Sequence, residues 1–233
     1  MNIALILAGG AGLRISNDKP KQYMEINGKP MLVHTVSRFA MHPEIDRVFV
    51  VAAKEQTEYV KNLLDAHNCS VDDIIPGGSD RRESSYNGVM YLDGHFSPDD
   101  IVLIHDAARP NVSAQIISQN IKIAGEKGAA VTAYLSQDTL LSGDENKLVA
   151  GYVDRKKTYI VQTPQSFRLG IISTAHRQIQ EKIDSSELDA AQITDDSQLT
   201  FFSGIQTAIV DGDKHNIKVT TQEDFSIICN IMK

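Results

Sequence analysis

The chain has no excess of positive charge, only two cysteines and no long apolar run. Its 233 residues carry 23 lysines and arginines against 30 aspartates and glutamates, which gives a formal net charge of -7. This balance excludes a typical nucleic-acid binder, because such a protein needs basic surface to replace the counterions of the phosphate backbone. We therefore expect the local basic clusters to serve small anions.

The cysteines and the apolar runs exclude further classes. Cys69 and Cys229 are far apart and fit no metal or redox spacing. No apolar stretch reaches transmembrane length, and the first one, residues 3–7, lacks the length and the basic start of a signal peptide. We expect a soluble cytoplasmic protein without a membrane partner. The length and the 42% hydrophobic content predict one domain, residues 1–233, around one substantial core.

The most informative segment follows that first apolar run and reads LILAGGAGLRISNDKPKQY. Glycines let backbone N–H groups approach an anion closely, and nearby cations can fold over it. The segment lacks the GK[ST] of a P-loop, and Ile15 stands where a dinucleotide fingerprint needs its next glycine. It predicts a phosphate cradle at the carboxyl end of a first strand. The residues that we expect to form it are Gly9, Gly10, Gly12, Arg14 and Lys21.

Apolar β-forming runs alternate with segments of helical periodicity along the chain. Helical spacing predicts helices at 31–41, 55–66, 82–91 and 113–126. Continuous apolar strands separated by helices indicate a mostly parallel α/β sheet that is buried on both faces. Ligands bind at the carboxyl ends of such strands, where the glycine loop and the segment HDAARP would both lie. The predicted strands are 3–7, 48–53, 74–75, 101–105, 129–134 and 207–210.

Residues 140–159 interrupt this alternation. They are polar and rich in turn formers, with β-forming residues on both sides, which predicts a hairpin that projects from the domain. An isolated two-stranded hairpin is at best marginally stable in water. We therefore expect it to lean on a second subunit.

Further segments allow a functional and a purely structural interpretation. Asp106 in HDAARP can hold Mg²⁺ that bridges phosphates, or it can cap a turn and pair with Arg109. The Gly-Gly turn and serines of residues 77–85 can read a base or ribose edge at a helix N-terminus, or can form an ordinary helix cap. The basic residues 155–157 can be solvated surface, and Thr194 resembles a helix N-cap.

In this order and spacing, the segments resemble the 2-C-methyl-D-erythritol 4-phosphate cytidylyltransferase family. The resemblance runs from Ile3 to about Phe225, and its most specific elements are the glycine loop with PKQY, HDAARP, VDR, TPQSF and NIKVT. It implies a Rossmann-like, mostly parallel twisted sheet flanked by helices, as in nucleotidyltransferases of the GT-A-like kind. It also implies a projecting β-hairpin arm, residues 138–160, through which a homodimer forms.

The resemblance further implies a role for each matched residue. Arg14, Lys21, Arg155 and Lys218 would be catalytic, and Asp106 would bind Mg²⁺ or another divalent cation. The arm would carry Thr139 and Arg155 into the site of the partner subunit. CTP would contact Ala8, Gly9, Gly10, Gly12, Gly78, Ser79, Ser84 and Ala107. The polyol phosphate would contact Thr139, Arg155, Thr163, Thr194 and Lys218.

The implied reaction moves CMP from CTP to 2-C-methyl-D-erythritol 4-phosphate and releases pyrophosphate, a step of non-mevalonate isoprenoid synthesis. A phosphate monoester carries about -1.5 to -2 charge near neutral pH, so its oxygen can attack the α-phosphorus without a covalent intermediate. The main obstacle is repulsion between two anions, which the cations would neutralise.

Other functions stay open at this point. A sister group activates D-ribitol 5-phosphate to CDP-ribitol for cell-surface polymers, and the LAGG form of residues 7–10 is closer to that group. Tyr23, the two alanines of HDAARP and Asp154 favour the methylerythritol phosphate instead. A hexose-1-phosphate nucleotidyltransferase and a nucleotide-binding regulatory module are the remaining alternatives.

Overall fold

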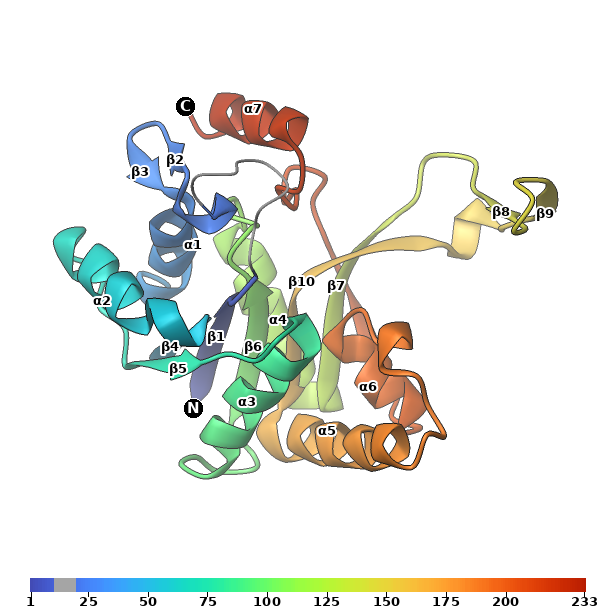
Figure 1. Cartoon of the computed structure of the whole chain (residues 1–233), viewed down its shortest axis with the longest axis horizontal. Helices are drawn as coiled ribbons and strands as arrows, with labels where there is room; N and C mark the ends of the chain where they lie inside the picture. The colour runs from blue at the N-terminus through green and yellow to red at the C-terminus, as the bar shows by residue number, and fades with distance from the viewer. Residues whose placement is uncertain (11–19) are drawn as a thin grey trace.

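A seven-stranded sheet forms the centre of the computed structural model, which describes residues 1–10 and 20–233 (Figure 1). Its strands lie in the order β11-β7-β10-β6-β1-β4-β5. All of them share one direction except β10, which is antiparallel to both of its neighbours. The strands are β1 (Asn2–Ala8), β4 (Arg47–Ala52), β5 (Asp73–Pro76), β6 (Ile101–Asp106), β7 (Ala129–Leu135), β10 (Tyr159–Arg168) and β11 (Ala208–Asp211).

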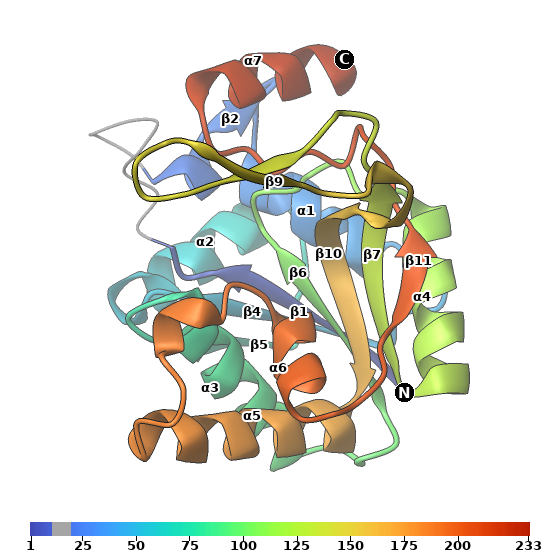
Figure 2. The ribbon, with the colours of Figure 1, turned by 90° about the vertical axis from the view of Figure 1, so that its right-hand side faces the viewer.

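Helices cover both faces of this sheet (Figures 1 and 2). On one face α1 (Met31–Ala40), α2 (Thr57–Ala66) and α4 (Ala114–Lys127) pack on one apolar cluster. On the other face α3 (Arg81–Asp93), α5 (Leu169–Asp184) and α6 (Asp196–Phe202) pack on a second one. In β1, Ala4 and Ile6 enter the first cluster, whereas Ile3 and Leu5 enter the second. The strand is therefore buried on both faces, as its continuous apolar pattern predicts.

The last helix, α7 (Gln222–Ile231), lies outside these two layers. It packs with the small hairpin of β2 (Glu25–Ile26) and β3 (Lys29–Pro30) through a third apolar cluster that includes Ile26 and Ile228. None of the helices in the described part of the chain is long and apolar enough to cross a membrane.

The prediction of a mostly parallel, Rossmann-like sheet is confirmed, and each of the predicted strands and helices is present within a few residues of its expected ends. The helices α5, α6 and α7 and the strand β10 were not predicted. Strand β10 escaped prediction because its centre, residues 162–166, is polar or proline and nevertheless buried. Its pairing with β7 shifts register between Val161 and Gln165, with a cis peptide bond at Pro164 between them. A proline inside a sheet is typically found at such an irregularity, because it cannot donate a hydrogen bond to the neighbouring strand.

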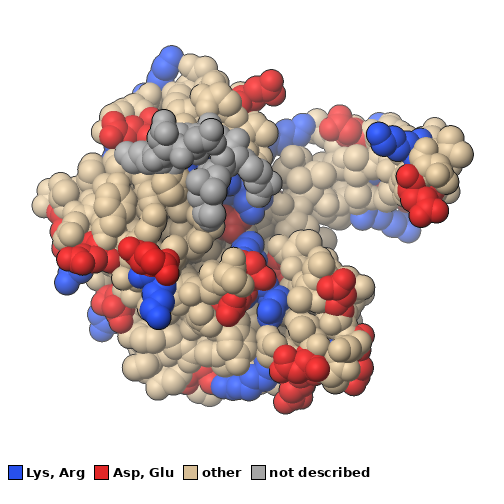
Figure 3. Space-filling model, viewed as in Figure 1, with Lys and Arg blue, Asp and Glu red and all other residues tan. Residues whose placement is uncertain are grey.

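The predicted hairpin is also confirmed, and residues 138–160 form an arm that stands away from the body (Figures 1 and 3). Its strands are β8 (Leu141–Gly143) and β9 (Val149–Tyr152), and the Asp144 carboxylate holds the turn by accepting from two backbone N–H groups. Five large apolar side chains of the arm are between 45% and 73% exposed: Leu141, Leu148, Val149, Tyr152 and Val153. Such exposure in one small hairpin is typical of a surface that another chain covers.

Helix α3 packs closely on the sheet at Gly88, and a substitution there can test this packing. A Cβ atom at Gly88 would lie 2.8 Å from Leu5 Cδ2 and 2.9 Å from Val51 Cγ2, so it would force the core apart. We expect Gly88→Ala to lower the free energy of unfolding by about 1–2 kcal/mol, because overpacking outweighs the gain in helix propensity. Urea denaturation measures this change.

Gly125→Ala in α4 is the matched control, because a Cβ atom there would meet nothing within 4 Å. We expect it to raise the free energy of unfolding by about 0.5–1 kcal/mol, from helix propensity alone. Equal effects of the two substitutions would contradict the close contact between α3 and the sheet.

Candidate active site

The carboxyl ends of four parallel strands meet at one edge of the sheet, as predicted. Strands β1, β4, β5 and β6 end there, and they are followed by Gly9, Ala53, Gly77 and Ala107. Gly9 and Gly10, which begin the glycine loop, and the segment after β6 thus lie at the same edge. Gly12 and Arg14 lie outside the described residues.

The glycines after β1 and β5 meet at one buried serine. Ser84 is 2% exposed, and its hydroxyl accepts a hydrogen bond from the backbone N–H of Gly78 at 3.1 Å. A Cβ atom would lie 2.9 Å from Ser84 Oγ at Gly9 and 2.8 Å at Gly77. Small residues at these two positions let the loops close over the serine. The predicted contacts of Ala8, Gly9, Gly10, Gly78 and Ser84 with CTP stay predictions.

The N-terminus of α3 is capped by Asp80, whose carboxylate accepts from Glu83 N. Ser79 donates from both its backbone N–H and its hydroxyl to the Glu83 carboxylate, at 2.7 and 2.6 Å. The segment of residues 77–85 therefore does form a helix cap, and the capping residue is Asp80. Ser84 makes its own bond one turn further on.

The carboxylate of Asp106 lies at the centre of the edge, among three cationic side chains. Lys218 Nζ is 2.8 Å from Oδ2, Arg81 Nε is 3.0 Å from Oδ1, and Arg109 Nε is 3.9 Å from Oδ2. Burial by itself would raise the pKa of Asp106, but Arg81 and Lys218 outweigh it and hold that pKa well below its usual range. Asp106 is therefore a carboxylate at neutral pH.

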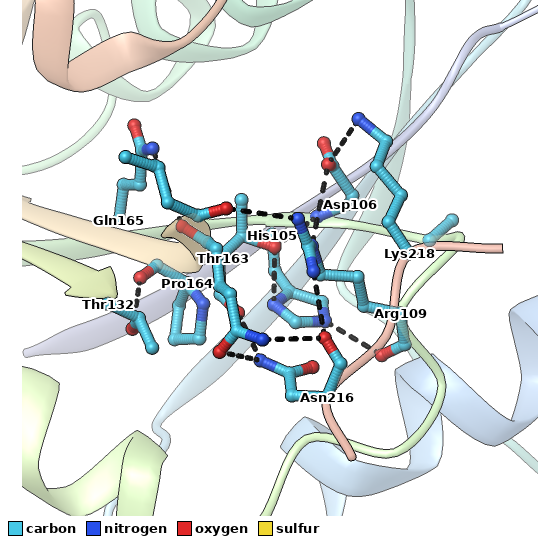
Figure 4. A network of polar contacts seen from close by, with 12 residues as sticks. His105, Asp106, Arg109, Thr132, Thr163, Pro164, Gln165, Asn216 and Lys218 are labelled. Atoms are coloured by element: carbon cyan, nitrogen blue, oxygen red, sulfur yellow. Dashed lines mark hydrogen bonds and ion pairs between the residues drawn. The ribbon is translucent and has the colours of Figure 1, made fainter. Parts of the chain in front are cut away.

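A buried chain of hydrogen bonds fixes the backbone of Asp106 (Figure 4). Asp106 N donates to Thr163 Oγ1 at 3.1 Å, and Thr163 Oγ1 is 3.0 Å from His105 Nδ1. His105 Nε2 is 3.0 Å from the carbonyl oxygen of Arg109, which can only accept. Burial lowers the pKa of His105 to about 4, so the ring is neutral, with its proton on Nε2, and Nδ1 accepts from the threonine hydroxyl.

These bonds give Thr163 a defined role. Thr163 is 3% exposed, and its hydroxyl bonds to two protein partners, so in this structure it orients Asp106. Its predicted contact with the polyol phosphate stays a prediction. Ala107 is similarly enclosed, because its N–H donates to Leu7 O at 3.0 Å and its carbonyl accepts from Thr35 Oγ1 at 2.8 Å.

Lys218 is held at the site by the residues on either side of it. Asn216 is fully buried, and its Nδ2 donates to Thr163 O at 2.9 Å, while its carbonyl accepts from Arg109 Nη1 at 2.8 Å. On the other side, Val219 N donates to the carbonyl of residue 108 at 2.8 Å. The segment that carries Lys218 is thereby tied to both β10 and the loop after β6.

A second lysine reaches the same segment from the N-terminal part of the chain. Lys21 Nζ donates to Val219 O at 2.8 Å, which places two catalytic candidates, Lys21 and Lys218, at neighbouring positions. The next residue, Gln22, is buried and donates from Nε2 to the carbonyls of Ala8 and Gly10, at 3.0 and 2.9 Å. Gln22 thus holds the start of the glycine loop.

Thr194 is not the helix cap that its sequence resembles. The N-cap of α6 is Asp195, which forms a reciprocal capping box with Gln198. Thr194 precedes the cap, is exposed, and bonds through its N–H and hydroxyl to Gln198 Oε1. Its position beside α6 leaves its hydroxyl at the surface, where the predicted contact with the polyol phosphate stays a prediction.

Thr139 and Arg155 belong to the arm, and both are exposed. Arg155 begins a short 3-10 helix (Arg155–Lys157) that follows β9. In Figure 1 the arm extends sideways, away from the sheet. Their predicted action in the site of a partner subunit stays a prediction.

Sequence reasoning missed several residues of the cluster. Arg81 and Asp196 were not singled out, although their nitrogen and oxygen are 2.8 Å apart and Arg81 also contacts Asp106. The roles of Gln22 and Asn216 were missed as well. Both residues stand in recognised motifs, PKQY and NIKVT, close to a lysine that was predicted to be catalytic. That closeness is the signal that could have identified them.

Comparison with known proteins agrees with this geometry. The family model described as 2-C-methyl-D-erythritol 4-phosphate cytidylyltransferase matches residues 2–233. The chain belongs to this family.

Proteins similar to this chain carry one of two names. The chain is 38% identical to the 2-C-methyl-D-erythritol 4-phosphate cytidylyltransferase of Thermosipho melanesiensis, over 98% of this chain and 96% of that protein. It is 35% identical to the ribitol-5-phosphate cytidylyltransferase of Streptococcus agalactiae serotype III, over 97% of this chain and 92% of that protein. The crystal structure of 4-diphosphocytidyl-2C-methyl-D-erythritol synthase from Anaerococcus prevotii superposes with a TM-score of 0.82 at 29% identity, covering 99% of this chain and 97% of that one.

Two buried histidines predict a loss of stability in acid. Burial lowers the pKa of both His105 and His176 from 6.5 to about 4. Between these pH values the unfolded chain binds more protons than the folded one, so the free energy of unfolding falls as the pH falls from about 6.5 to about 4. Each histidine contributes a slope of up to about 1.4 kcal/mol per pH unit, and neither contributes above pH 6.5. Urea denaturation at several pH values measures the slope.

The substitution His176→Gln should reduce this slope, even if it also lowers stability at pH 7. His215→Gln is the control, because the His215 ring is 69% exposed, and it should leave the slope unchanged. An identical slope in His176→Gln and the unsubstituted protein would contradict a neutral, buried His176.

Proposed function

We propose that this chain transfers CMP from CTP to 2-C-methyl-D-erythritol 4-phosphate and releases pyrophosphate. The observation that carries the proposal is the cluster of Lys21, Lys218 and Asp106 at the carboxyl edge of the sheet, in a chain whose whole length matches the cytidylyltransferase family. The family name describes the reaction, and the cluster has the charges that the reaction needs.

The cluster is electropositive although the whole chain is acidic. Three cations (Arg81, Arg109 and Lys218) face two carboxylates (Asp106 and Asp196), which leaves one positive charge in excess. Lys21 lies next to this cluster, where its Nζ donates to the carbonyl of Val219. Both substrates of the proposed reaction are polyanions, so this excess favours their approach to each other.

The chemistry follows from charge and position. The phosphate monoester of the acceptor is already an anionic nucleophile, and its oxygen attacks the α-phosphorus of CTP while pyrophosphate leaves. In this proposal Lys21 and Lys218 neutralise the charge that develops on the α-phosphate and the leaving group, and their contacts at the edge of the sheet support that role. Lys218 is 37% exposed at its side chain, so its ammonium can leave Asp106 for a substrate oxygen. No side chain needs to form a covalent bond.

Asp106 suits Mg²⁺ as a single protein ligand. A carboxylate has about four lone-pair sites, of which Arg81 and Lys218 use two. Within residues 1–10 and 20–233, no group of three or more His, Cys, Asp or Glu side chains could form a metal cage. The remaining ligands would be phosphate and water oxygens, as is usual for Mg²⁺. When bound, the ion would supply additional positive charge at the phosphates.

The acceptor is the finer part of the proposal, and D-ribitol 5-phosphate is the alternative. The relative from Streptococcus agalactiae carries that name, and LAGG at residues 7–10 points the same way. Tyr23, the alanines of HDAARP and Asp154 favour 2-C-methyl-D-erythritol 4-phosphate, and so does the family model. We also propose a cytoplasmic location, which suits a reaction between two phosphorylated small molecules.

We further propose that the arm joins two copies of the chain into a homodimer. Its exposed apolar side chains support this proposal, because a small hairpin gains stability when they are covered. Arg155 and Thr139 would then enter the partner's site, where the guanidinium fork of Arg155 can bind the acceptor phosphate.

The first test is pyrophosphate release with CTP and Mg²⁺, with 2-C-methyl-D-erythritol 4-phosphate and D-ribitol 5-phosphate offered side by side. We expect turnover with the first to be much faster, because three motif positions match that group. Faster turnover with the second would assign the chain to CDP-ribitol synthesis. Turnover with UTP and a sugar 1-phosphate, but with neither polyol phosphate, would contradict a cytidylyltransferase.

The second test is complementation between two inactive variants, Arg155→Ala and Lys218→Ala. If each site combines Lys218 of one subunit with Arg155 of its partner, a mixed dimer contains one intact site. Random mixing of equal amounts should then restore roughly a quarter of the unsubstituted activity, from the symmetry of a two-fold dimer. Lys157→Ala, an exposed neighbour in the same turn of the arm, is the control and should stay active. No recovery after verified subunit exchange would contradict the exchange of the arm.

A further inference from the structure

Arg81 joins three elements that are far apart in the sequence. It is the first residue of α3, and its guanidinium contacts Asp106 at the end of β6 and Asp196 at the start of α6. Nε is 3.0 Å from Asp106 Oδ1, and Nη2 is 2.8 Å from Asp196 Oδ2. One planar fork therefore holds two carboxylates at once, which the single ammonium of a lysine could not do in the same way.

Asp196 is a buried anion that is fixed from both sides. Its side chain is 2% exposed, and its other oxygen accepts from the hydroxyl of Ser85 at 2.5 Å. Ser85 Oγ is also 3.5 Å from His176 Nε2, and burial lowers the pKa of His176 to about 4, so that ring is neutral at pH 7. Arg81 is thus the cation that compensates Asp196. A buried carboxylate without such a partner is costly.

The same bridge links the two sides of the proposed site. Upstream of Arg81 lies the turn with Gly78, and downstream in α3 lies Ser84, both predicted to bind CTP. Immediately before α6 lies Thr194, predicted to bind the polyol phosphate. Asp106 stands between these two sides.

Two of the three cations around Asp106, Arg81 and Lys218, differ in how firmly they are held. Arg81 has a second carboxylate as an anchor and a side chain that is 26% exposed, whereas Lys218 has a side chain that is 37% exposed. The Arg81 contact with Asp106 does not depend on Lys218, so it would remain if Lys218 turned to a substrate oxygen.

We propose that Arg81 and Asp196 form a positioning pair that holds Asp106 between the nucleotide side and the acceptor side of the site. The pair acts through Asp106 and through the start of α6, without contact with the reacting atoms. Its part in catalysis rests on the proposed function, whereas the physical coupling of the two residues does not.

The kinetic test compares Arg81→Lys and Asp196→Asn with the unsubstituted protein, with CTP and the better polyol phosphate. Partners that orient a metal-binding carboxylate typically contribute about 10- to 100-fold to activity, so we expect kcat to fall by about that factor with little change in either KM. Ser85→Ala keeps both charges and removes one bond to Asp196, so its loss of kcat should be smaller. An unchanged kcat per folded molecule in Arg81→Lys would overturn the proposal.

Arg82→Lys is the matched control. It is the next residue of the same helix, and its Nη1 donates to Gln180 Oε1 on α5 at 2.8 Å, away from Asp106. We expect its kcat to stay near that of the unsubstituted protein. An equal loss of kcat in Arg82→Lys and Arg81→Lys would overturn the proposal, because it would show only that α3 is disturbed.

A second readout does not depend on activity. A double-mutant cycle with Arg81→Lys and Asp196→Asn, measured by urea denaturation, should give effects on the free energy of unfolding that are not additive, since the residues are in direct contact. Additive effects would overturn the proposal, because they would show that Arg81 and Asp196 are not energetically coupled. If the unsubstituted protein turns over neither polyol phosphate, the proposed function fails, and this cycle still decides whether the pair exists.

Discussion

The arrangement of this molecule around its site depends on one buried carboxylate, that of Asp106, whose negative charge must be balanced by cations. Asp106 ends a central strand at the edge where the predicted substrate loops meet, and a buried carboxylate is stable only with cations and hydrogen-bond donors around it. Arg81 arrives from α3, Lys218 from the segment before α7, and Arg109 from the loop after β6 itself. Segments from across the chain thus converge on one group, and their convergence creates the positive charge that two polyanionic substrates need.

The polar middle of β10 is the second part of this arrangement. Thr163 accepts from Asp106 N and bonds with a neutral His105, while Asn216 donates to Thr163 O. Each of these buried groups satisfies another, so the strand can cross the sheet with polar side chains in its centre. This network connects the segment of Lys218 to the end of β6.

The accuracy of the sequence predictions followed the kind of signal that each segment carries. Continuous apolar runs such as that of β1 identified a doubly covered parallel sheet, because burial on both faces leaves no polar position. The hairpin was visible from its turn formers, and Asp106 and Lys218 were recognised from their motifs. Strand β10 carries no such signal, since its polar residues look like a loop until their partners are known. Thr194 was taken for a cap because threonine and aspartate are both common N-cap residues and stand side by side here, and the structure assigns that role to Asp195.

The sequence by itself determined the α/β class, the edge of the sheet at which the site lies and the family to which the chain belongs, because these depend on local patterns and on short motifs in order. Only the tertiary structure decided which charges meet there. Arg81 and Asp196 are separated by more than a hundred residues, and nothing in their local sequence links them to each other or to Asp106. Ion pairs of this kind depend on how strands and helices are placed in space, which the long-range packing of the core decides.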